Sequence, residues 1–394
     1  MRSESGALLS SAEDIKKRGV EHFHELLNQP TNAVWHILRG VYIHPTLEEL
    51  DAPITMAEVV TAVNNSRLRK GTGPDGILPK ILAHGGSALR SFLFAIFNLL
   101  WATKELPSDW IDANVCTLFK KGDRSLCGNY RGVSLLSVVG KAFADILLQP
   151  LQYLTESFYP ESLSGYRKNR GTVDGIFTLR LIMEKSREQN LHNAFIDFTK
   201  TFDSVNRELL FAILEKLGCP AKLSRVIKKL NTNVHARLII DGELSEPIKC
   251  NSGVKQGCKL APTLFGVYAA VLLLLAFKNI CPTYSFNICF RYDGDIFDLR
   301  RLKAKTQVLT SYLRETQYAD DVAIFCNDAT SLQHLLSTCN GLPHKMGLRI
   351  NTKKTETMSI GEYADFHVNG GKVTKVDHFK NLGSYVSNDC TYAR

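Results

Sequence analysis

Apolar residues along this chain follow two repeats, one of three to four positions and one of two. The longer repeat predicts helices over residues 21–27, 138–154, 172–187, 210–217 and 332–339, and a wholly apolar helix over 264–277. Short runs rich in β-branched and aromatic residues predict strands over residues 115–119, 130–136, 194–198, 236–240, 244–250 and 317–325. Helices and strands therefore recur through the whole chain.

Turn residues connect these elements. The pairs Asp241-Gly242 and Asn369-Gly370 predict two-residue hairpin turns, and residues 379–385 predict a further short strand pair. Residues 347–355 predict a turn followed by a basic strand. Residues 281–316 look irregular and then basic, and the stretch over 278–316 is interpreted as an insertion. Residues 67–76 form a loop by composition, whose basic lead-in serves either to hold phosphates or simply to connect two elements.

Two adjacent carboxylates, Asp320 and Asp321, lie at the tip of the hairpin predicted over 317–325. Like charges this close repel unless a cation lies between them, and a divalent metal ion is the natural occupant. A solvated acidic turn gives the same pattern, so these two residues alone leave both interpretations open. Asp197 adds a third carboxylate within the apolar strand over 194–198, where an isolated acid would be costly.

Composition and charge favour a nucleic-acid partner. The 394 residues are 44% hydrophobic and 22% charged, as in ordinary globular proteins, and the formal net charge of +9 suggests an acidic partner. The ten cysteines are scattered without zinc-ligand spacing and no secretory signal opens the chain, so we expect an intracellular protein that is not secreted. The apolar run over 264–277 is too short to span a bilayer, and we expect no membrane partner.

Three short stretches suit phosphate and nucleotide binding. Lys120 and Lys121 follow a predicted strand at a glycine turn, where cations could clamp a triphosphate. Residues 165–171 place three cations and an aromatic side chain in one loop, which suits a phosphate backbone with a stacked base. The Gln256-Gly257 step opens the apolar helix and permits a ligand to approach closely. Exposed basic turns without a ligand would have the same composition.

The carboxylates predict a chemistry if their strands are neighbours. Asp197 and the tip at Asp320 and Asp321 would then meet at one edge of an antiparallel sheet. Such an edge would bind two Mg²⁺ ions, with Mn²⁺ as an alternative, about 3.5–4 Å apart, the geometry for in-line displacement at phosphorus. One ion would activate a 3′-hydroxyl, and the other would hold the triphosphate and neutralise the leaving pyrophosphate. The residues therefore predict nucleotidyl transfer onto a nucleic-acid 3′ end.

Three motifs occur in a fixed order, at residues 195–203, 253–258 and 318–321, the last reading Tyr-Ala-Asp-Asp. With the lysine and glycine motifs that follow, they closely resemble the reverse transcriptase domain of non-LTR (LINE-type) retrotransposons over roughly residues 21–385. The resemblance implies an α+β fold of the right-hand polymerase type, with fingers, an antiparallel palm sheet and a thumb. It also implies an RNA-directed DNA polymerase that adds dNTPs to the 3′ end of a DNA primer on an RNA template.

The resemblance assigns a role to each matching residue. As metal ligands and catalytic residues it implies Asp197, Asp320 and Asp321, with Lys354 as the general acid that assists the departure of pyrophosphate. For the nucleotide it implies the triphosphate cations Lys120 and Arg131, the steric gate Phe202, and the pocket residues Gln256 and Gly257. For the nucleic acid it implies Arg167 and Arg170 along the template, and Leu382 and Gly383 as the primer grip.

The resemblance also divides the chain. It implies an N-terminal helical extension over 1–60, fingers over 61–190, and a palm over 191–394 that ends near the primer grip. We expect the thumb to be largely missing and no endonuclease module to precede residue 21, as in a fragment of a longer element with poor processivity. The sequence departs from the family pattern at Thr201, Ala261, Asn169 and Gly171, which suggests relaxed selection or a decayed copy.

Two other functions stay open at this point. A catalytically silent remnant of a retroelement would bind RNA or DNA through its basic fingers, with strong salt dependence and no primer extension. The third interpretation is a maturase-like or bacterial retroelement polymerase. The insertion before Tyr318 and the stretch over 130–136 disfavour it.

Overall fold

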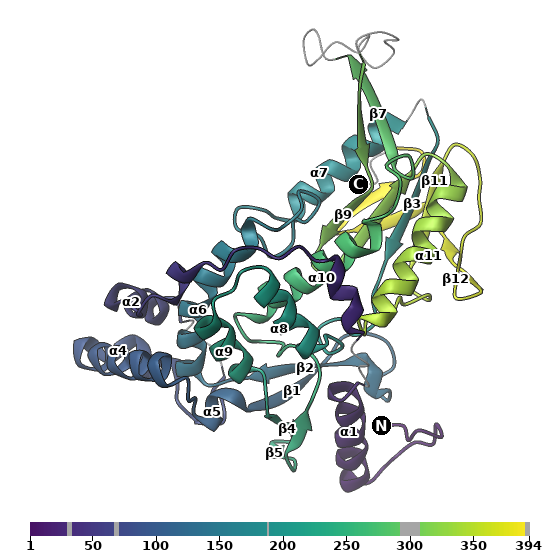
Figure 1. The fold of residues 1–394 in the computed structure, drawn as a ribbon. Coiled ribbons are helices and arrows are strands. Elements are labelled where there is room, and N and C mark those ends of the chain that lie inside the picture. Colours follow the sequence, from purple (N-terminus) through teal and green to yellow (C-terminus); the bar gives the residue numbers. More distant parts are fainter. Residues whose placement is uncertain (30–33, 67–70, 187–188, 292–307, 391–394) are drawn as a thin grey trace. The chain divides into compact units, whose positions relative to one another are not determined.

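The computed structural model describes residues 1–29, 34–66, 71–186, 189–291 and 308–390, and the chain divides into two compact units (Figure 1). Unit 1 comprises Met1–Phe158 and Lys200–Tyr268, and unit 2 comprises Tyr159–Thr199 and Ala269–Arg394. The basic lead-in at 67–70 and the centre of the predicted insertion, 292–307, lie outside the described residues. The predicted division into extension, fingers and palm stays a prediction.

Unit 1 is built on a sheet of five strands. These are β1 (Ala113–Phe119), β2 (Tyr130–Leu135), β4 (Val234–Ile240), β5 (Glu243–Leu244) and β6 (Ile248–Cys250). They lie in the order β2-β1-β4-β5, with β6 also paired to β4, and among these pairs only β1 with β4 is parallel. The predicted strands over 115–119, 130–136 and 236–240 and the Asp241-Gly242 turn are confirmed.

Helices surround this sheet. They are α1 (Ala12–Leu27), α2 (Met56–Asn64), α3 (Pro79–His84), α4 (Gly86–Thr103), α5 (Ser108–Ile111), α6 (Val138–Glu156), α8 (Arg207–Lys216) and α9 (Ala221–Leu230), with 3₁₀ turns η1 (Trp35–Gly40), η2 (Glu48–Asp51) and η3 (Cys127–Asn129). Phe23 and Leu26 of α1 pack against Val115, Leu238 and Ile248 of the sheet to form one core of this unit. The helices predicted over 21–27, 138–154 and 210–217 are confirmed, as is the stop at Gly218, whose φ is +88°.

Helix α4 is the one helix among the described residues that is long and apolar enough to cross a membrane, judged by length and composition alone. Its Leu93, Phe97 and Trp101 are nevertheless buried within unit 1, and Trp101 Nε1 donates a hydrogen bond to Ala52 O at 3.1 Å. Phe92 on another side of α4 is 62% exposed. One face of α4 is therefore anchored in the unit by packing and by a hydrogen bond.

The return strand predicted over 244–250 is wrong in its continuity, because the structure divides it into β5 and β6. Pro247 lies between them and has no backbone N–H to give to a ladder. Ser245 bridges the gap: its backbone N donates to Leu238 O and its Oγ accepts from Leu238 N, both at 2.9 Å. The side chain thus replaces a missing ladder bond.

Unit 2 is built on a second five-stranded sheet, in the order β14-β11-β3-β10-β9. Its strands are β3 (Leu191–Ile196), β9 (Glu315–Tyr318), β10 (Asp321–Cys326), β11 (Glu356–Ile360) and β14 (Thr374–Lys375), antiparallel except for β11 with β14. Three further antiparallel pairs are β7 (Phe286–Arg291) with β8 (Val308–Leu313), β12 (His367–Val368) with β13 (Gly371–Lys372), and β15 (His378–Asn381) with β16 (Ser384–Ser387). Helix α10 (Ala261–Phe277), as predicted from its apolar run, crosses the boundary between the units.

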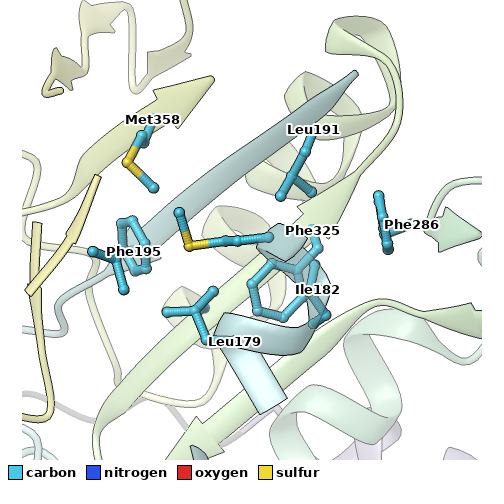
Figure 2. Packing of buried hydrophobic residues seen from close by; sticks show 10 residues of the cluster. Leu179, Ile182, Leu191, Phe195, Phe286, Phe325 and Met358 are labelled. Atoms are coloured by element: carbon cyan, nitrogen blue, oxygen red, sulfur yellow. The ribbon is translucent and has the colours of Figure 1, made fainter. Parts of the chain in front are cut away.

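Helices cover both faces of the unit 2 sheet. Figure 2 shows Leu179 and Ile182 of α7 (Thr172–Lys185) in one cluster with Phe195, Phe325 and Met358 of the strands. Successive residues of a strand point to opposite faces, so the alternate residues of β3 and β10 face away from this cluster. Helix α11 (Ala329–Lys345) contacts both strands and covers that other face. Strand β3 is buried along its whole length as a result.

Two predictions for unit 2 are wrong in position. Residues 351–355 form a turn and not a basic strand, since Lys354 N and Thr355 N both donate to Asn351 O, and β11 begins only at Glu356. The interpretation of 281–316 as irregular is wrong where β7 and β8 pair, with Phe286 fully buried as an anchor. The Asn369-Gly370 turn and the strand pair over 379–385 are confirmed.

Candidate active site

The carboxylates of unit 2 lie at one edge of its sheet. Strand β3 pairs with β10 in a register that sets Ile196 opposite Val322, so Asp197, one residue further, is aligned with Asp321. Strands β9 and β10 are joined by a two-residue turn, in which Ala319 has a φ of +57° and Asp320 follows it. The expected adjacency of the strands is confirmed, and it brings all three predicted metal ligands to the same end of neighbouring strands.

Asp197 is held from both sides of its backbone by the turn that carries Lys354. Asn351 N donates to Asp197 O at 2.7 Å, and Asp197 N donates to Thr355 Oγ1 at 3.3 Å. This attachment places Lys354 Nζ 3.5 Å from Asp197 Oδ2. The same Oδ2 is buried and has no hydrogen-bond partner among the described residues. A buried anionic oxygen without a hydrogen bond is costly, and it needs a cation nearby.

The pKa of Asp321 is raised from 3.8 to about 6. The main cause is the protein around its carboxyl, which displaces water even though one side of the residue is exposed, and the next is the like charge of Asp320 and Asp197. The ammonium of Lys354 acts in the opposite direction. The three carboxylates are therefore close enough to repel one another.

These residues fit a divalent cation in donor type and in place. Carboxylate oxygens are ligands that Mg²⁺ prefers, and Asp197, whose buried Oδ2 has no hydrogen bond among the described residues, lies within electrostatic range of Asp321. Within the described residues, however, no three acidic, imidazole or thiol side chains are gathered closely enough to hold a metal ion with their present positions. Binding would therefore require the carboxylate side chains to converge, and the assignment of metal ligands stays a prediction.

The loop with Gln256 is organised within unit 1. Arg131 Nε donates to Gln256 Oε1 at 2.8 Å, and Ser134 N donates to Gln256 O at 2.8 Å. Gly257 has a φ of +123°, and a Cβ built there would lie 2.6 Å from Ser134 O, so a larger residue could not approach strand β2 this closely. The structure thus brings together three sequence-predicted nucleotide residues, Arg131, Gln256 and Gly257.

Two buried cations, Arg207 and Lys255, hold this loop in place. Arg207 donates to the carbonyls of Cys250, Ser252 and Gly253 at 2.7–2.9 Å. Lys255 Nζ donates to the carbonyls of Ile111 and Leu230 at 2.9 and 2.6 Å. Burial lowers the pKa of Arg207 to about 10 and that of Lys255 to about 8. Each cation therefore replaces water with backbone carbonyls of its own unit.

Phe202 and Asp203 lie beside the same loop. Val254 N donates to Phe202 O at 2.8 Å, and the Phe202 ring stacks on Phe265 with 4.8 Å between centroids. Burial raises the pKa of Asp203 to about 6, against the opposing charges of Lys200, Lys120 and Arg131. The acid therefore lies within electrostatic range of the two predicted triphosphate cations, a relationship that the sequence did not indicate.

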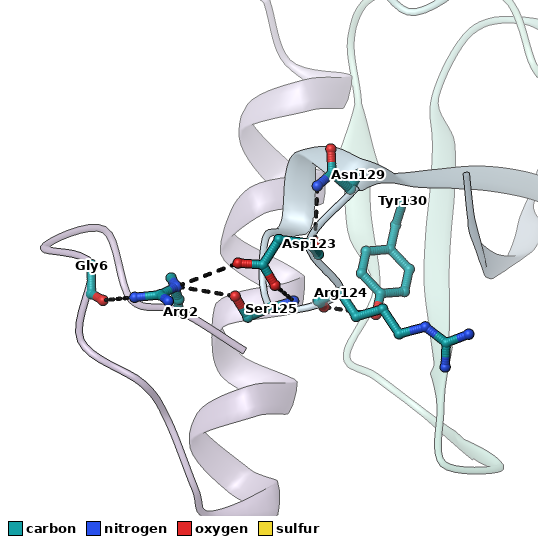
Figure 3. A network of polar contacts seen from close by, with 7 residues as sticks. All are labelled: Arg2, Gly6, Asp123, Arg124, Ser125, Asn129 and Tyr130. Atoms are coloured by element: carbon teal, nitrogen blue, oxygen red, sulfur yellow. Dashed lines mark hydrogen bonds and ion pairs between the residues drawn. The ribbon is translucent and has the colours of Figure 1, made fainter. Parts of the chain in front are cut away.

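Lys120 is exposed. The turn that follows it is held by a network of hydrogen bonds, which Figure 3 shows. Arg2 Nε donates to Ser125 Oγ at 3.0 Å and lies 3.7 Å from Asp123 Oδ2, and Asn129 Nδ2 donates to Asp123 O at 2.9 Å. Lys120 N donates to Asn129 O at 2.9 Å. The N-terminal segment therefore helps to shape the turn that presents Lys120.

The predicted template arginines are engaged with the protein itself. The Arg167 side chain is 6% exposed, and its guanidinium donates to Pro160 O at 3.0 Å and to Leu163 O at 3.3 Å. Arg170 donates to Glu161 Oε2 at 2.6 Å and is more exposed. A nucleic-acid contact stays a prediction for both, but the position of Arg167 favours a structural role.

The predicted primer grip forms the turn between β15 and β16. Leu382 and Gly383 both have positive φ, +49° and +89°, as a two-residue hairpin turn requires. A Cβ on Gly175 of α7 would lie 2.9 Å from Leu382 Cδ1, so Leu382 occupies the space that this glycine leaves. Arg180 of α7 donates to Ser384 Oγ at 2.7 Å. Helix α7 thus holds this turn in place.

Sequence reasoning missed Arg207, Asp203 and Gly165, of which the last is described below. Asp203 was visible within the motif over 195–203, but its spacing gave no partner. Arg207 carried no signal, because a charged residue at the start of a helix is usually solvated.

Comparisons with known proteins agree on one family. The family described as reverse transcriptase (RNA-dependent DNA polymerase) matches residues 119–386. A retrovirus-related Pol polyprotein from the type-1 retrotransposable element R2 of Bradysia coprophila is 25% identical over 80% of this chain and 33% of its own length. For the probable RNA-directed DNA polymerase from transposon BS of Drosophila melanogaster the identity is 26%, over 79% of this chain and 33% of that protein.

The polymerase of the mobile element jockey from Drosophila melanogaster is 24% identical over 86% of this chain and 36% of its own length. The chain thus spans about a third of the length of the relatives it matches. The family implies a right-hand polymerase fold and generally uses divalent metal ions, and the antiparallel-rich sheets described above agree with that fold. Relatives from retrotransposable elements confirm the LINE-type resemblance, and the chain belongs to the reverse transcriptase family.

Proposed function

We propose that this chain acts inside the cell as an RNA-directed DNA polymerase that adds dNTPs to a primer 3′ end on an RNA template. The single observation that supports this function best is the register of β3 with β10, which aligns Asp197 with Asp321 beside the Asp320 turn. Three carboxylates at one sheet edge suit two-metal nucleotidyl transfer, whereas a structural turn has no need of them.

Asp197, Asp320 and Asp321 would hold two Mg²⁺ ions, or Mn²⁺ in their place. Bound there, the ions supply a lowered pKa for the primer 3′-hydroxyl and charge neutralisation for the leaving pyrophosphate. The chain's own contribution is to fix the acids on adjacent strands, so that the side chains, and not the strands, have to converge on the ions. The buried Oδ2 of Asp197, which has no hydrogen-bond partner among the described residues, supports this assignment.

Lys354 is proposed to donate the proton that the departing pyrophosphate takes up. Its ammonium lies 3.5 Å from Asp197 Oδ2, and its side chain is 61% exposed, so it can move toward a substrate. The turn over 351–355 keeps it at the acid edge through two backbone bonds to Asp197. A cation at the leaving oxygen would both stabilise charge and transfer a proton.

In unit 1, Lys120 and Arg131 are proposed to bind the triphosphate, and Gln256 with Gly257 the incoming nucleotide. The bond from Arg131 to Gln256 pre-organises two of these side chains before a ligand arrives. Phe202 is proposed as the steric gate against a 2′-hydroxyl, because its stacking on Phe265 fixes the plane of the ring.

Primer extension on an RNA template tests the function directly. Rates of dNTP incorporation would be compared for the wild type, Asp320→Ala and Asp365→Ala, the last a control in which an exposed acid of unit 2 loses its pair with Lys372. Loss of a metal ligand should lower the rate at least about a thousandfold, or roughly 4 kcal/mol of transition-state stabilisation. Equal incorporation by wild type and Asp320→Ala would contradict the proposal.

A catalytically silent nucleic-acid binder is the second candidate. The observation that favours it is the present side-chain arrangement, in which the described residues include no group of three ligands ready for a metal. Such a protein would bind RNA with a steep salt dependence, extend no primer, and behave identically with and without Asp320→Ala.

A further inference from the structure

The start of the loop that the resemblance assigns to the template lies against the acidic hairpin. Leu163 and Gln317 form a parallel bridge, in which Gln317 N donates to Ser162 O and Ser164 N donates to Gln317 O, both at 2.8 Å. These two bonds attach the segment over 162–167 to the outer side of β9. We call this segment the brace.

Gly165 brings the brace into direct contact with the turn. A Cβ on this buried glycine would lie 2.1 Å from Ala319 N and 2.9 Å from Tyr318 C. Both atoms belong to the backbone immediately before Asp320, so no side-chain rotation could relieve the overlap. Only glycine permits this approach. The residue that Gly165 contacts, Ala319, has a left-handed backbone conformation, with φ at +57°.

Arg167 locks the brace in its shape. Its buried guanidinium donates to the carbonyls of Pro160 and Leu163 and lies 5.9 Å from the centroid of the Tyr159 ring. A cation that contacted a phosphate backbone would need to face solvent, and this side chain is 6% exposed. The residue therefore acts on the carbonyl that precedes Ser164 and Gly165.

The buried side chain of Gln317 also supports the turn at Ala319. The side chain is buried, its Nε2 donates to Ala319 O at 3.0 Å, and its Oε1 has no hydrogen-bond partner among the described residues. The protein thus tolerates a buried unsatisfied oxygen at this position, which is a cost that functional sites commonly carry. Brace and Gln317 together hold Ala319 on two sides.

We propose that Gly165 is a positioning residue, which through its backbone contact with Ala319 sets where the Asp320 and Asp321 carboxylates lie. The inference rests on the polymerase function proposed above and deepens it. It gives the Gly-Tyr-Arg part of the basic loop the task of supporting the catalytic turn. It also explains why the cation of Arg167 is buried.

The test compares Gly165→Ala with Gly341→Ala in steady-state primer extension on RNA. Gly341 is exposed on α11 of the same unit, and a Cβ there meets nothing within 4 Å. Displacing the turn should lower kcat of Gly165→Ala roughly a hundredfold and raise the half-saturating Mg²⁺ concentration, while KM for dNTP and RNA affinity stay unchanged. Gly341→Ala should match the wild type in each measurement.

The possible outcomes separate this inference from the function on which it rests. An inactive wild type would reject the polymerase function itself. An active wild type with an equally active Gly165→Ala, at the same Mg²⁺ requirement, would overturn the role of Gly165. A parallel loss of kcat and of RNA affinity, with an unchanged Mg²⁺ requirement, would also overturn it, because that pattern describes a binding loop.

If Gly165→Ala does not fold, Arg167→Gln carries the test. If Arg167 stabilises the brace, Arg167→Gln should lower kcat and raise the Mg²⁺ requirement. The slope in a plot of log RNA affinity against log salt concentration should stay unchanged. A phosphate contact predicts that the slope falls by roughly one when the charge is removed. The second result would overturn the assignment of the brace.

Discussion

The loop that carries Gln256 and the sheet edge that carries Asp197 treat buried charge in opposite ways. In the loop, Arg207 and Lys255 are buried, and five backbone carbonyls accept hydrogen bonds from them. At the edge, the buried Asp197 Oδ2 has no hydrogen-bond partner among the described residues and lies 3.5 Å from the exposed ammonium of Lys354, and Asp321 has a raised pKa beside two other acids.

The buried cations of unit 1 hold the backbone in place, whereas the carboxylates at the sheet edge are available to bind a ligand. A cation matched by carbonyls gains little from a further partner, so Arg207 and Lys255 are interpreted as parts of the scaffold. A buried anionic oxygen that has no hydrogen bond within the described part of the chain, and whose neighbouring ammonium, Lys354, is 61% exposed, still gains from a divalent cation. This contrast assigns chemistry to the sheet edge without any appeal to the motif, and each half of it can be tested.

The largest effect is expected from Arg207→Met. Methionine fills similar space but leaves the carbonyls of Cys250, Ser252 and Gly253 without their donor, and buried unsatisfied groups cost about 1–3 kcal/mol each. We expect the free energy of unfolding to fall by about 3–5 kcal/mol in urea titrations. Arg225→Met, on the exposed side of α9, is the matched control and should change it by less than about 0.5 kcal/mol. A loss as small as the control's would mean that Arg207 does not hold the loop.

Lys255 should make stability depend on pH in a predictable direction. Burial lowers its pKa from 10.5 to about 8, so between these values the folded chain binds fewer protons than the unfolded chain. The free energy of unfolding therefore rises with pH across that window, by at most about 3 kcal/mol. Below the window the folded chain carries the charged ammonium of Lys255, which burial disfavours.

The measurement is the stability of the wild type relative to Lys255→Met, by urea titration at pH 7.5, 9 and 10.5. The wild type should gain on the variant as pH rises. Lys249→Met, which alters an exposed lysine next to the same loop, should show a constant difference. A flat difference for Lys255→Met as well would show that this ammonium is not desolvated.

Much of the fold could be predicted from local patterns. Apolar runs gave the strands that carry Asp197 and the acidic tip, and Asp-Gly and Asn-Gly pairs gave the turns between β4 and β5 and between β12 and β13, because these signals depend only on neighbouring residues. The parallel pairing of β1 with β4 could not be predicted, since the two strands are far apart in sequence and neither pattern names a partner. The turn over 351–355 was mistaken for a strand because its apolar neighbour Ile350 continued the alternation.

The candidate site divides in the same way. The acids and the Gln256-Gly257 step could be singled out because their side chains or glycines are unusual for their setting. The burial of Arg167 could not, since the carbonyls that accept from it belong to backbone whose path the sequence does not reveal. Lys354 is similar, because its pair with Asp197 depends on two hydrogen bonds of the Asp197 backbone: Asp197 O accepts from Asn351 N, and Asp197 N donates to Thr355 Oγ1. Sequence therefore predicts which groups are chemically apt, and the fold decides which of them face a ligand.

The smallest effect tests whether the sheet edge binds a divalent cation. If the carboxylates bind Mg²⁺ with Kd on the order of 1 mM, 10 mM MgCl₂ should raise the free energy of unfolding by about 1.4 kcal/mol, because an ion that binds only the folded chain stabilises it. Asp197→Asn should abolish this gain, since it removes the negative charge of the Asp197 carboxylate, whereas Asp365→Asn should keep it. Arg207→Met should also keep the full gain, even though it lowers the baseline, because its charge was already matched. If magnesium stabilised Asp197→Asn as much as the wild type, the Asp197 carboxylate would not be part of a cation site. The contrast between the loop and the sheet edge would then give no information about catalysis.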